Sequence, residues 1–262
     1  MLTPKSLLLA ALVVATATAQ SLFAQEDEVP TTKWTGGGDG KSWSQGSNWS
    51  TGHPPTAEEN VSTNGAEITV QGGDNEAAIL MLDKTTLTIE ADAEMKVVGR
   101  HGKVCLITGE SEICVHGKLL LSTALYFKKS AITVDGSGVI FPPTTTKGFL
   151  QMNFTLNLVG DKAKINKLYM VGGQAEMNMN LTFGPSGIDP IDTKLLELGD
   201  MSTLTVDVSK YKPNSNGTSV TLFTFKEGGG TGQFATVNVT GGTGTIQYNA
   251  KDVTLSDIVV KP

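Results

Sequence analysis

A triplet of two apolar residues around one small residue recurs along the chain. The middle residue is Thr, Asn or Cys, and the triplets are Ile68–Val70, Leu87–Ile89, Ile113–Val115, Ile132–Val134, Leu156–Leu158, Met177–Met179, Leu204–Val206 and Val237–Val239. Alternation with a period of two is typical of a β-strand with one buried face, so each triplet predicts two inward side chains around an outward one. Successive triplets end about 19 to 33 residues apart, and most of these intervals match one coil of a solenoid.

A second apolar stretch precedes many triplets by a few residues, and a glycine or polar turn follows them. These stretches are Leu80–Leu82, Leu125–Phe127, Leu150–Met152, Tyr169–Val171 and Leu196–Leu198. A unit of two short strands cannot bury its apolar face alone, whereas stacked units form a continuous core. The pattern therefore predicts an all-β, right-handed parallel β-helix. An antiparallel β-sandwich is the alternative, because it also has short alternating strands at regular spacing.

The organisation expected along the chain has four parts. Residues 1–24 combine a positive start, an apolar run and small residues, which indicates a secretory signal peptide. Residues 25–66 are expected to form an N-terminal cap, 67–210 the coils, and 211–262 a terminal coil with C-terminal capping strands. The last part is richer in glycine, and capping would protect the final strand edge from aggregation.

Charge narrows the range of partners. The chain has a formal net charge of −6, and Arg100 is its single arginine. It therefore lacks the basic face that nucleic-acid binding requires. No segment after the signal peptide predicts a membrane span, so a secreted, periplasmic or cell-surface protein without membrane insertion is expected.

Two cysteines, Cys105 and Cys114, flank a short predicted turn. In an exported protein they are compatible with a disulfide, or with two buried thiols that behave as small apolar residues. Nothing around them resembles a metal site, and no cofactor is expected.

All three tryptophans lie in residues 34–50, WTGGGDGKSWSQGSNWS. Exposed rings in a row would suit a glycan, because an aromatic ring presents a flat apolar face with a polar edge. The segment also comes just before the first triplet, where a solenoid needs a lid. We therefore expect Trp34, Trp43 and Trp49 to form a cap, with glycan contact as the alternative.

Catalytic chemistry is weakly represented. A polysaccharide lyase would need a base near carboxylates, and the best basic candidates are Arg100, His101, Lys103 and His116, with Glu110 and Glu112 close in sequence. These residues also suit polar turns at the corners of a solenoid. No convincing pair of glycosidase carboxylates is found, and the histidines lack the spacing of zinc ligands.

The segment WTGGGDGKSWSQGSNWSTGHPPTAEENV, residues 34–61, resembles the opening of exported, autotransporter-like β-helical proteins of planctomycetes and verrucomicrobia. The closing segment of the chain, residues 234–260, resembles the end of their passenger-like domains. The resemblance implies an exported bacterial β-helical protein and no activity. Neither the membrane barrel of a complete autotransporter nor a sorting tail is recognised.

Two functions are compatible with these features. The leading hypothesis is a non-enzymatic structural or adhesive protein of the cell surface or extracellular matrix, which contacts glycans or other surface proteins. The alternative is a carbohydrate-binding or polysaccharide-lyase-like protein, which rests on analogy between folds. The oligomeric state is left open.

Overall fold

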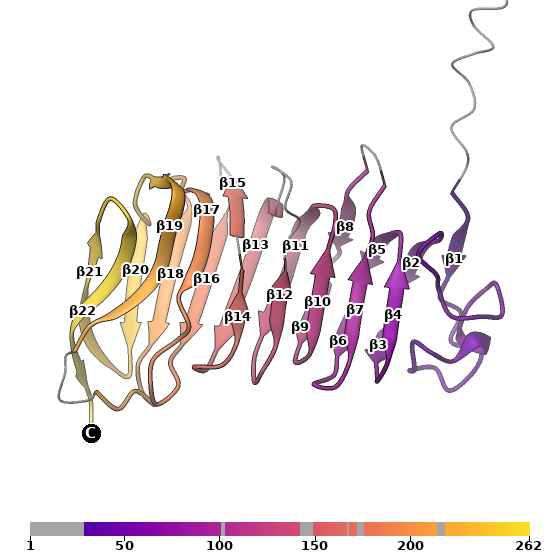
Figure 1. Ribbon diagram of the computed structural model, residues 1–262, viewed down its shortest axis with the longest axis horizontal. Helices are drawn as coiled ribbons and strands as arrows, with labels where there is room; N and C mark the ends of the chain where they lie inside the picture. The colour runs from indigo at the N-terminus through magenta and orange to yellow at the C-terminus, as the bar shows by residue number, and fades with distance from the viewer. Residues whose placement is uncertain (1–28, 101–102, 142–148, 167, 172–175, 214–217) are drawn as a thin grey trace, which may run out of the picture. The chain divides into compact units, whose positions relative to one another are not determined.

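The regular structure of the described residues is β-strand apart from one short 3-10 helix (Figure 1). The computed structural model describes residues 29–100, 103–141, 149–166, 168–171, 176–213 and 218–262. Within these ranges lie 22 strands and the 3-10 helix Gly46–Asn48. The predicted all-β class is confirmed. The expected signal peptide, residues 1–24, lies outside the described residues.

A 17-stranded sheet contains two sets of strands that pair in parallel in chain order. We call them the first and second stacks. The first stack consists of β2 (Asn60–Asn64), β5 (Ile79–Asp83), β8 (Cys105–Thr108), β15 (Leu168–Val171), β17 (Ile191–Glu197) and β19 (Val220–Thr231). The second consists of β3 (Glu67–Val70), β6 (Thr86–Ile89), β9 (Glu112–Val115), β16 (Met177–Thr182), β18 (Ser202–Asp207) and β20 (Thr236–Thr240). Two longer strands, β11 (Leu125–Val134) and β13 (Phe149–Val159), continue through both stacks.

A separate five-stranded parallel sheet was not anticipated from the sequence. Its strands are β4 (Asp74–Ala77), β7 (Glu94–Val97), β10 (Lys118–Leu121), β12 (Val139–Phe141) and β14 (Lys164–Ile165). We call it the third stack. Its strands are short, and each follows the glycine or polar turn after a triplet. The units from β2 to β14 therefore contain a third strand position, whereas the described later units keep two.

The triplets of the second stack align residue by residue. The first residues of the aligned triplets form one inward column, which consists of Ile68, Leu87, Ile113, Ile132, Leu156, Met179, Leu204 and Val237. All of these side chains are buried except that of Val237. The predicted triplet Met177–Met179 lies in β16 with both methionines buried, but it is offset by two residues from the other triplets, because Leu156 pairs with Met179 rather than with Met177. The aligned triplet is therefore Met179–Leu181.

The turn between the first and second stacks repeats in successive units. At this turn Lys84, Glu110, Lys129 and Asn153 adopt positive φ angles of 47°, 67°, 51° and 56°. Side chains other than glycine seldom adopt this left-handed conformation. Gly65 and Gly109 have positive φ angles at the same corner, so the left-handed turn recurs whether or not the residue is glycine.

Residues 31–262 form one compact unit, and the strand pairing changes from parallel to antiparallel at its C-terminal end. At the N-terminal end, β1 (Thr31–Lys33) pairs in parallel with β2, so parallel pairing begins before the predicted boundary at residue 67. At the C-terminal end, β22 (Asp252–Val260) pairs antiparallel with both β19 and β21 (Gly242–Tyr248).

Candidate functional site

The candidate catalytic residues lie in three different connections of the repeating unit. Arg100 and Lys103 are between β7 and β8, Glu110 is between β8 and β9, and His116 follows β9. The chain turns at each of these connections and enters the next stack. Residues that are close in sequence are therefore distributed over successive corners, and the predicted basic and acidic groups do not form one cluster. His101 lies outside the described residues.

Arg100 is engaged by a carboxylate. Its Nη2 donates hydrogen bonds of 2.7 Å to Glu58 Oε2 and 3.0 Å to the Glu58 carbonyl oxygen. The Arg100 side chain is 32% exposed, whereas that of Glu58 is 78% exposed. The pair joins the β7–β8 connection to the segment before β2, and an ion pair this accessible to water contributes little to stability. Lys103, three residues further along the chain, is exposed. Its backbone carbonyl accepts a hydrogen bond of 2.7 Å from Thr123 Oγ1.

His116 is paired with Asp135 of the next unit. His116 Nδ1 contacts Asp135 Oδ1, and both side chains are about one-third exposed. Asp135 follows β11 as His116 follows β9, so the pair links equivalent corners of successive units. The contact therefore joins two neighbouring units side chain to side chain.

Cys105 and Cys114 are both free thiols, so the disulfide alternative is wrong for this structure. Cys105 points into the core, where its Sγ accepts a hydrogen bond of 3.3 Å from the Leu80 amide. Cys114 occupies an outward position between Ile113 and Val115, and its pairing partners in the neighbouring strands are Thr88 and Thr133. One thiol faces inward and the other outward, so the two sulfur atoms are directed apart.

The two thiols are also poor nucleophiles. Burial raises the pKa of Cys105 to about 12. Burial and the neighbouring Glu112 carboxylate raise the pKa of Cys114 to about 11. A thiol reacts as its thiolate, so both groups are protonated and unreactive at neutral pH.

A groove of about 410 Å³ with polar walls lies at the corner between the first and second stacks. Four successive units contribute to it, and its lining residues are Glu110, Ser111, Glu112, Lys129, Ser130, Ala131, Asn153, Thr155, Glu176 and Asn178. Three carboxylates face one ammonium group among hydroxyl and amide side chains. Such walls can both donate and accept hydrogen bonds, as recognition of a polar ligand requires.

Two features of the sequence shape this groove. The left-handed residues Glu110, Lys129 and Asn153 bend the chain at the same corner of successive units. Ala131 occupies the position aligned with Glu112 and Thr155, where its small side chain leaves space.

Lys129, Asn153 and Glu176 were missed as candidate residues because each carries no motif of its own. Alignment of the units by their triplets brings these residues together. The triplets that define this alignment were recognisable in the sequence, so the sequence carried most of the signal needed to find these residues.

A continuous chain of side-chain hydrogen bonds runs beside the groove on the outward face of the second stack. Thr133 Oγ1 donates to Glu112 Oε1 at 2.6 Å, and Asn157 Nδ2 donates to Thr133 Oγ1 at 2.9 Å. Asn180 Nδ2 then donates to Asn157 Oδ1 at 2.8 Å. We call these four residues the polar ladder. The middle residues of three aligned triplets, together with Glu112, thus connect four successive units.

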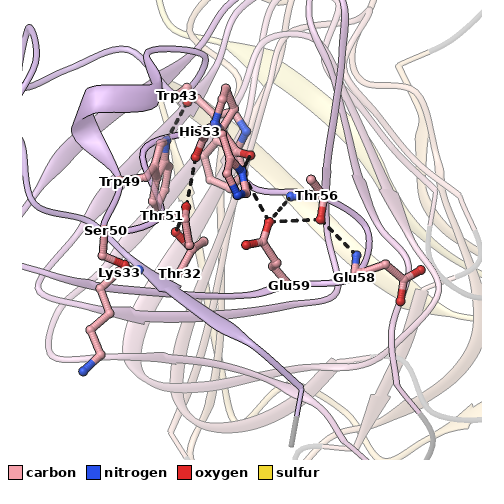
Figure 2. Close-up of polar contacts among 11 residues, drawn as sticks. Thr32, Lys33, Trp43, Trp49, Ser50, Thr51, His53, Thr56, Glu58 and Glu59 are labelled. Carbon is pink, nitrogen blue, oxygen red and sulfur yellow. Dashed lines mark hydrogen bonds and ion pairs between the residues drawn. The ribbon is translucent and has the colours of Figure 1, made fainter.

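The tryptophan-rich segment is built into the core (Figure 2). Trp43 and Trp49 are 1% and 2% exposed, and Trp34 is partly buried against them. The Trp43–Trp49 and Trp34–Trp49 ring centroids are each 4.9 Å apart in edge-to-face geometry. Trp49 Nε1 donates a hydrogen bond of 2.7 Å to the Trp43 carbonyl oxygen. Buried rings offer no face to a sugar, so Trp43 and Trp49 do not form the exposed platform of the glycan alternative.

Backbone hydrogen bonds attach this segment to the first strands. The Trp43 amide donates to the Thr69 carbonyl and the Thr69 amide donates to the Lys41 carbonyl, both at 2.9 Å. Residues 41–43 therefore cover the outer edge of β3. The Trp34 amide donates to the Ser62 carbonyl at 3.0 Å, which extends the pairing of β1 with β2.

Asp39 and Asn48 organise the glycine-rich loop between the tryptophans. Buried Asn48 accepts hydrogen bonds at Oδ1 from the amides of Gly38 and Gly40, and its Nδ2 donates to Asp39 Oδ1 at 2.7 Å. Ser42 donates to Asp39 through both its hydroxyl group, at 2.5 Å, and its amide, at 2.8 Å. These hydrogen bonds, led by that of the Ser42 hydroxyl, hold the pKa of Asp39 well below its usual range.

Glu59 is a buried carboxylate at the base of the same segment. Its Oε2 accepts hydrogen bonds of 3.0 Å from both the amide and the hydroxyl group of Thr56, and it lies 3.8 Å from His53 Nδ1 (Figure 2). The Thr51 hydroxyl contacts the Thr32 hydroxyl at 2.9 Å and donates to the His53 carbonyl. These contacts hold the segment in place.

Comparisons with known proteins add no identification, because no protein-family model, curated protein or solved structure matches the chain. Within the described residues, no group of three or more His, Cys, Asp or Glu side chains is arranged to hold a metal ion. The same part of the chain has no helix with the length and hydropathy of a membrane span.

Trp43→Ala should destabilise the protein by about 3–5 kcal/mol, because it removes a buried indole ring and leaves a cavity. Urea unfolding followed by circular dichroism measures this loss. Trp34→Ala is the matched control and should have a smaller effect, since Trp34 is only partly buried. Equal, small effects of both substitutions would show that the packing of Trp43 does not support the fold.

Asp39 should make folding stability depend on pH in the acidic range. The ordinary pKa of an aspartate carboxyl group is 3.8, and folding lowers the pKa of Asp39 below this value. The ionised Asp39 side chain therefore stabilises the fold fully above pH 3.8, and this stabilisation is lost as the pH falls towards the lower folded pKa. Asp39→Asn should therefore flatten the fall in stability between pH about 4 and about 2. Urea unfolding across this range tests the effect, with Asp200→Asn, at an exposed turn, as the control. An unchanged slope in Asp39→Asn would contradict the assignment.

Proposed function

We propose that the protein is an exported, non-enzymatic structural or adhesive protein whose stacks form a right-handed parallel β-helix. The three stacks recur in the same order from β2 to β14, the first and second stacks continue to β20, and strands of one stack pair in parallel with their counterparts in neighbouring units. Parallel strands joined by a crossover connection are nearly always right-handed. This arrangement supports the helical solenoid and its hand.

The pairing gives less support to the antiparallel sandwich. Among the described strand pairs, antiparallel pairing occurs only in β19–β22 and β21–β22. A sandwich would have antiparallel hairpins throughout. We interpret these last strands as a C-terminal cap and the tryptophan-rich segment as the N-terminal cap, because each covers strands at its own end.

The polar ladder is the observation that carries the non-enzymatic proposal. Side chains on the second stack are bonded to one another from unit to unit, whereas Arg100 and His116 are paired with Glu58 and Asp135 at separate corners. An enzyme needs its acid, base and charge-stabilising groups within reach of one reacting bond. An extended, hydrogen-bonded face instead suits contact over a large area with a glycan or another surface protein.

Export remains part of this proposal. It rests on the signal-like pattern of residues 1–24 and on the resemblance of residues 34–61 to autotransporter-like proteins of the bacterial cell surface. A location outside the cytoplasm, in the periplasm or at the cell surface, follows from that pattern.

The proposal predicts adhesion without turnover. The purified protein should be retained on plates coated with acidic or neutral polysaccharides, and it should produce neither reducing ends nor unsaturated products. Arg100→Ala should leave retention unchanged, because its guanidinium is engaged by Glu58. Cleavage by the wild type that Arg100→Ala abolishes, at an unchanged melting temperature, would overturn the non-enzymatic proposal. Absence of retention on every surface would overturn its adhesive form.

The groove favours carbohydrate binding as a second candidate function. Its hydroxyl, amide and carboxylate groups match the alternating donors and acceptors of a sugar, and four units line it. None of the described lining residues is aromatic, so affinity would depend on hydrogen bonds. Saccharide binding would be weak and selective for hydroxyl geometry.

Ala131→Trp tests this second candidate because it fills the centre of the groove. We expect it to reduce oligosaccharide binding on a glycan array by about tenfold or more, equivalent to about 1.4 kcal/mol. Thr205→Trp, at an outward position of β18 outside the groove, should leave binding unchanged. Equal binding by both variants would show that the groove is not the saccharide site.

A further inference from the structure

The strands at the ends of the first and second stacks differ in whether other backbone segments cover their outer edges. Residues 41–43 cover the edge of β3, and the Ser50 amide and hydroxyl group bond the backbone of Lys33 in β1. At the other end, β22 covers the edge of β19. In contrast, the only strand that pairs with β20 within the described residues is β18. The second stack therefore ends in a strand whose outer edge has no backbone partner in the described chain.

The side chains of β20 confirm that this end is uncovered. Val237 occupies the inward column and is 39% exposed, whereas its neighbour Leu204 is fully buried. Thr236, Asn238 and Thr240 are exposed as well. A further strand beside β20 would continue the inward column and cover Val237.

Devices that commonly prevent edge pairing are missing from β20. Natural edge strands carry charges, proline or bulges. Other strands that pair on one side have such features, since β4 contains Asp74 and Glu76 and β14 contains Lys164. Residues 232–250, which include β20, have no charged side chain in a chain with a net charge of −6. Two copies can therefore approach through this end without strong local repulsion.

The sequence of β20 is a palindrome, Thr-Val-Asn-Val-Thr. In antiparallel pairing centred on Asn238, each residue faces its own kind: Asn238 faces Asn238, Val237 faces Val239, and Thr236 faces Thr240. Pairs of threonines and of β-branched residues stabilise antiparallel strands. A two-fold axis through Asn238 thus gives complementary contacts from one strand sequence.

We propose that β20 is a self-association edge, at which two copies of the chain pair their β20 strands antiparallel about Asn238. The isologous arrangement is favoured over head-to-tail stacking because the edges of β1 and β3 at the opposite end are covered. The contact joins two stacks into one continuous sheet. A five-residue pairing is small for a protein interface, so the association is reversible and depends on concentration. This proposal does not rest on the adhesive function, since the edge pairs whether or not a surface is bound.

Sedimentation velocity of the full protein, from about 1 µM to about 1 mM, tests the proposal. The wild type should shift from monomer to dimer within this range. Asn238→Lys places two ammonium groups face to face at the two-fold axis and should weaken the dimer by about tenfold or more. Thr245→Lys on β21 adds the same charge to the adjacent strand, away from the axis, and should still form dimers. Thermal melting of both variants verifies that the fold is kept.

Disulfide trapping gives an independent measurement. Asn238→Cys in a Cys114→Ser background should form a covalent dimer on mild oxidation, whereas Thr245→Cys should not. A wild type that stays monomeric throughout, or a dimer unaffected by Asn238→Lys, would overturn the proposal. Cross-linking through Thr245→Cys instead would assign the contact to β21 and would equally overturn it.

Discussion

The parallel register of neighbouring strands is the constraint on which the rest of the structure depends. Each interior strand of the second stack aligns its inward residues with those of the strands on both sides, as Leu87 does with Ile68 and Ile113. A slip of one residue would turn every inward side chain of that strand to the outside. The aliphatic column therefore fixes the register, and the register fixes which outward side chains become neighbours.

This constraint decides where polar chemistry gathers. Residues about one unit apart meet at the usual strand spacing, so Thr133, Asn157 and Asn180 form hydrogen bonds although they are distant in sequence. Residues a few positions apart, such as Arg100 and Glu110, are instead separated by a change of stack. Groups on such a scaffold line up along the stack, which suits extended contact better than convergence on a single bond.

The alternation of apolar and small residues was enough to predict the strands of the second stack and the all-β class. The third stack was missed because its strands are short, and in Lys118–Leu121 three apolar residues in succession hide the alternation. The two-residue offset of the predicted triplet Met177–Met179 has a similar cause. Residues Met177–Leu181 alternate throughout and contain two equivalent triplets. The groove depended on the backbone bend at Lys129 and Asn153. Lysine does not signal a left-handed conformation, and asparagine, which favours it more than most residues, is too frequent in this chain to mark the bend by itself.

A stack held by register has the same physical weakness at both ends, because its last strands expose backbone donors and acceptors. The N-terminal end uses a separate device, in which tryptophan rings fill the core while residues 41–43 occupy the edge of β3. The C-terminal end reverses the chain so that β22 occupies the edge of β19. That reversal protects the first stack alone, since the chain leaves β20 at Gly241 and enters the hairpin directly. The exposed edge of β20 is thus a geometric consequence of how the hairpin closes its neighbour, and its uncharged, symmetric sequence makes it suitable for pairing with its own copy.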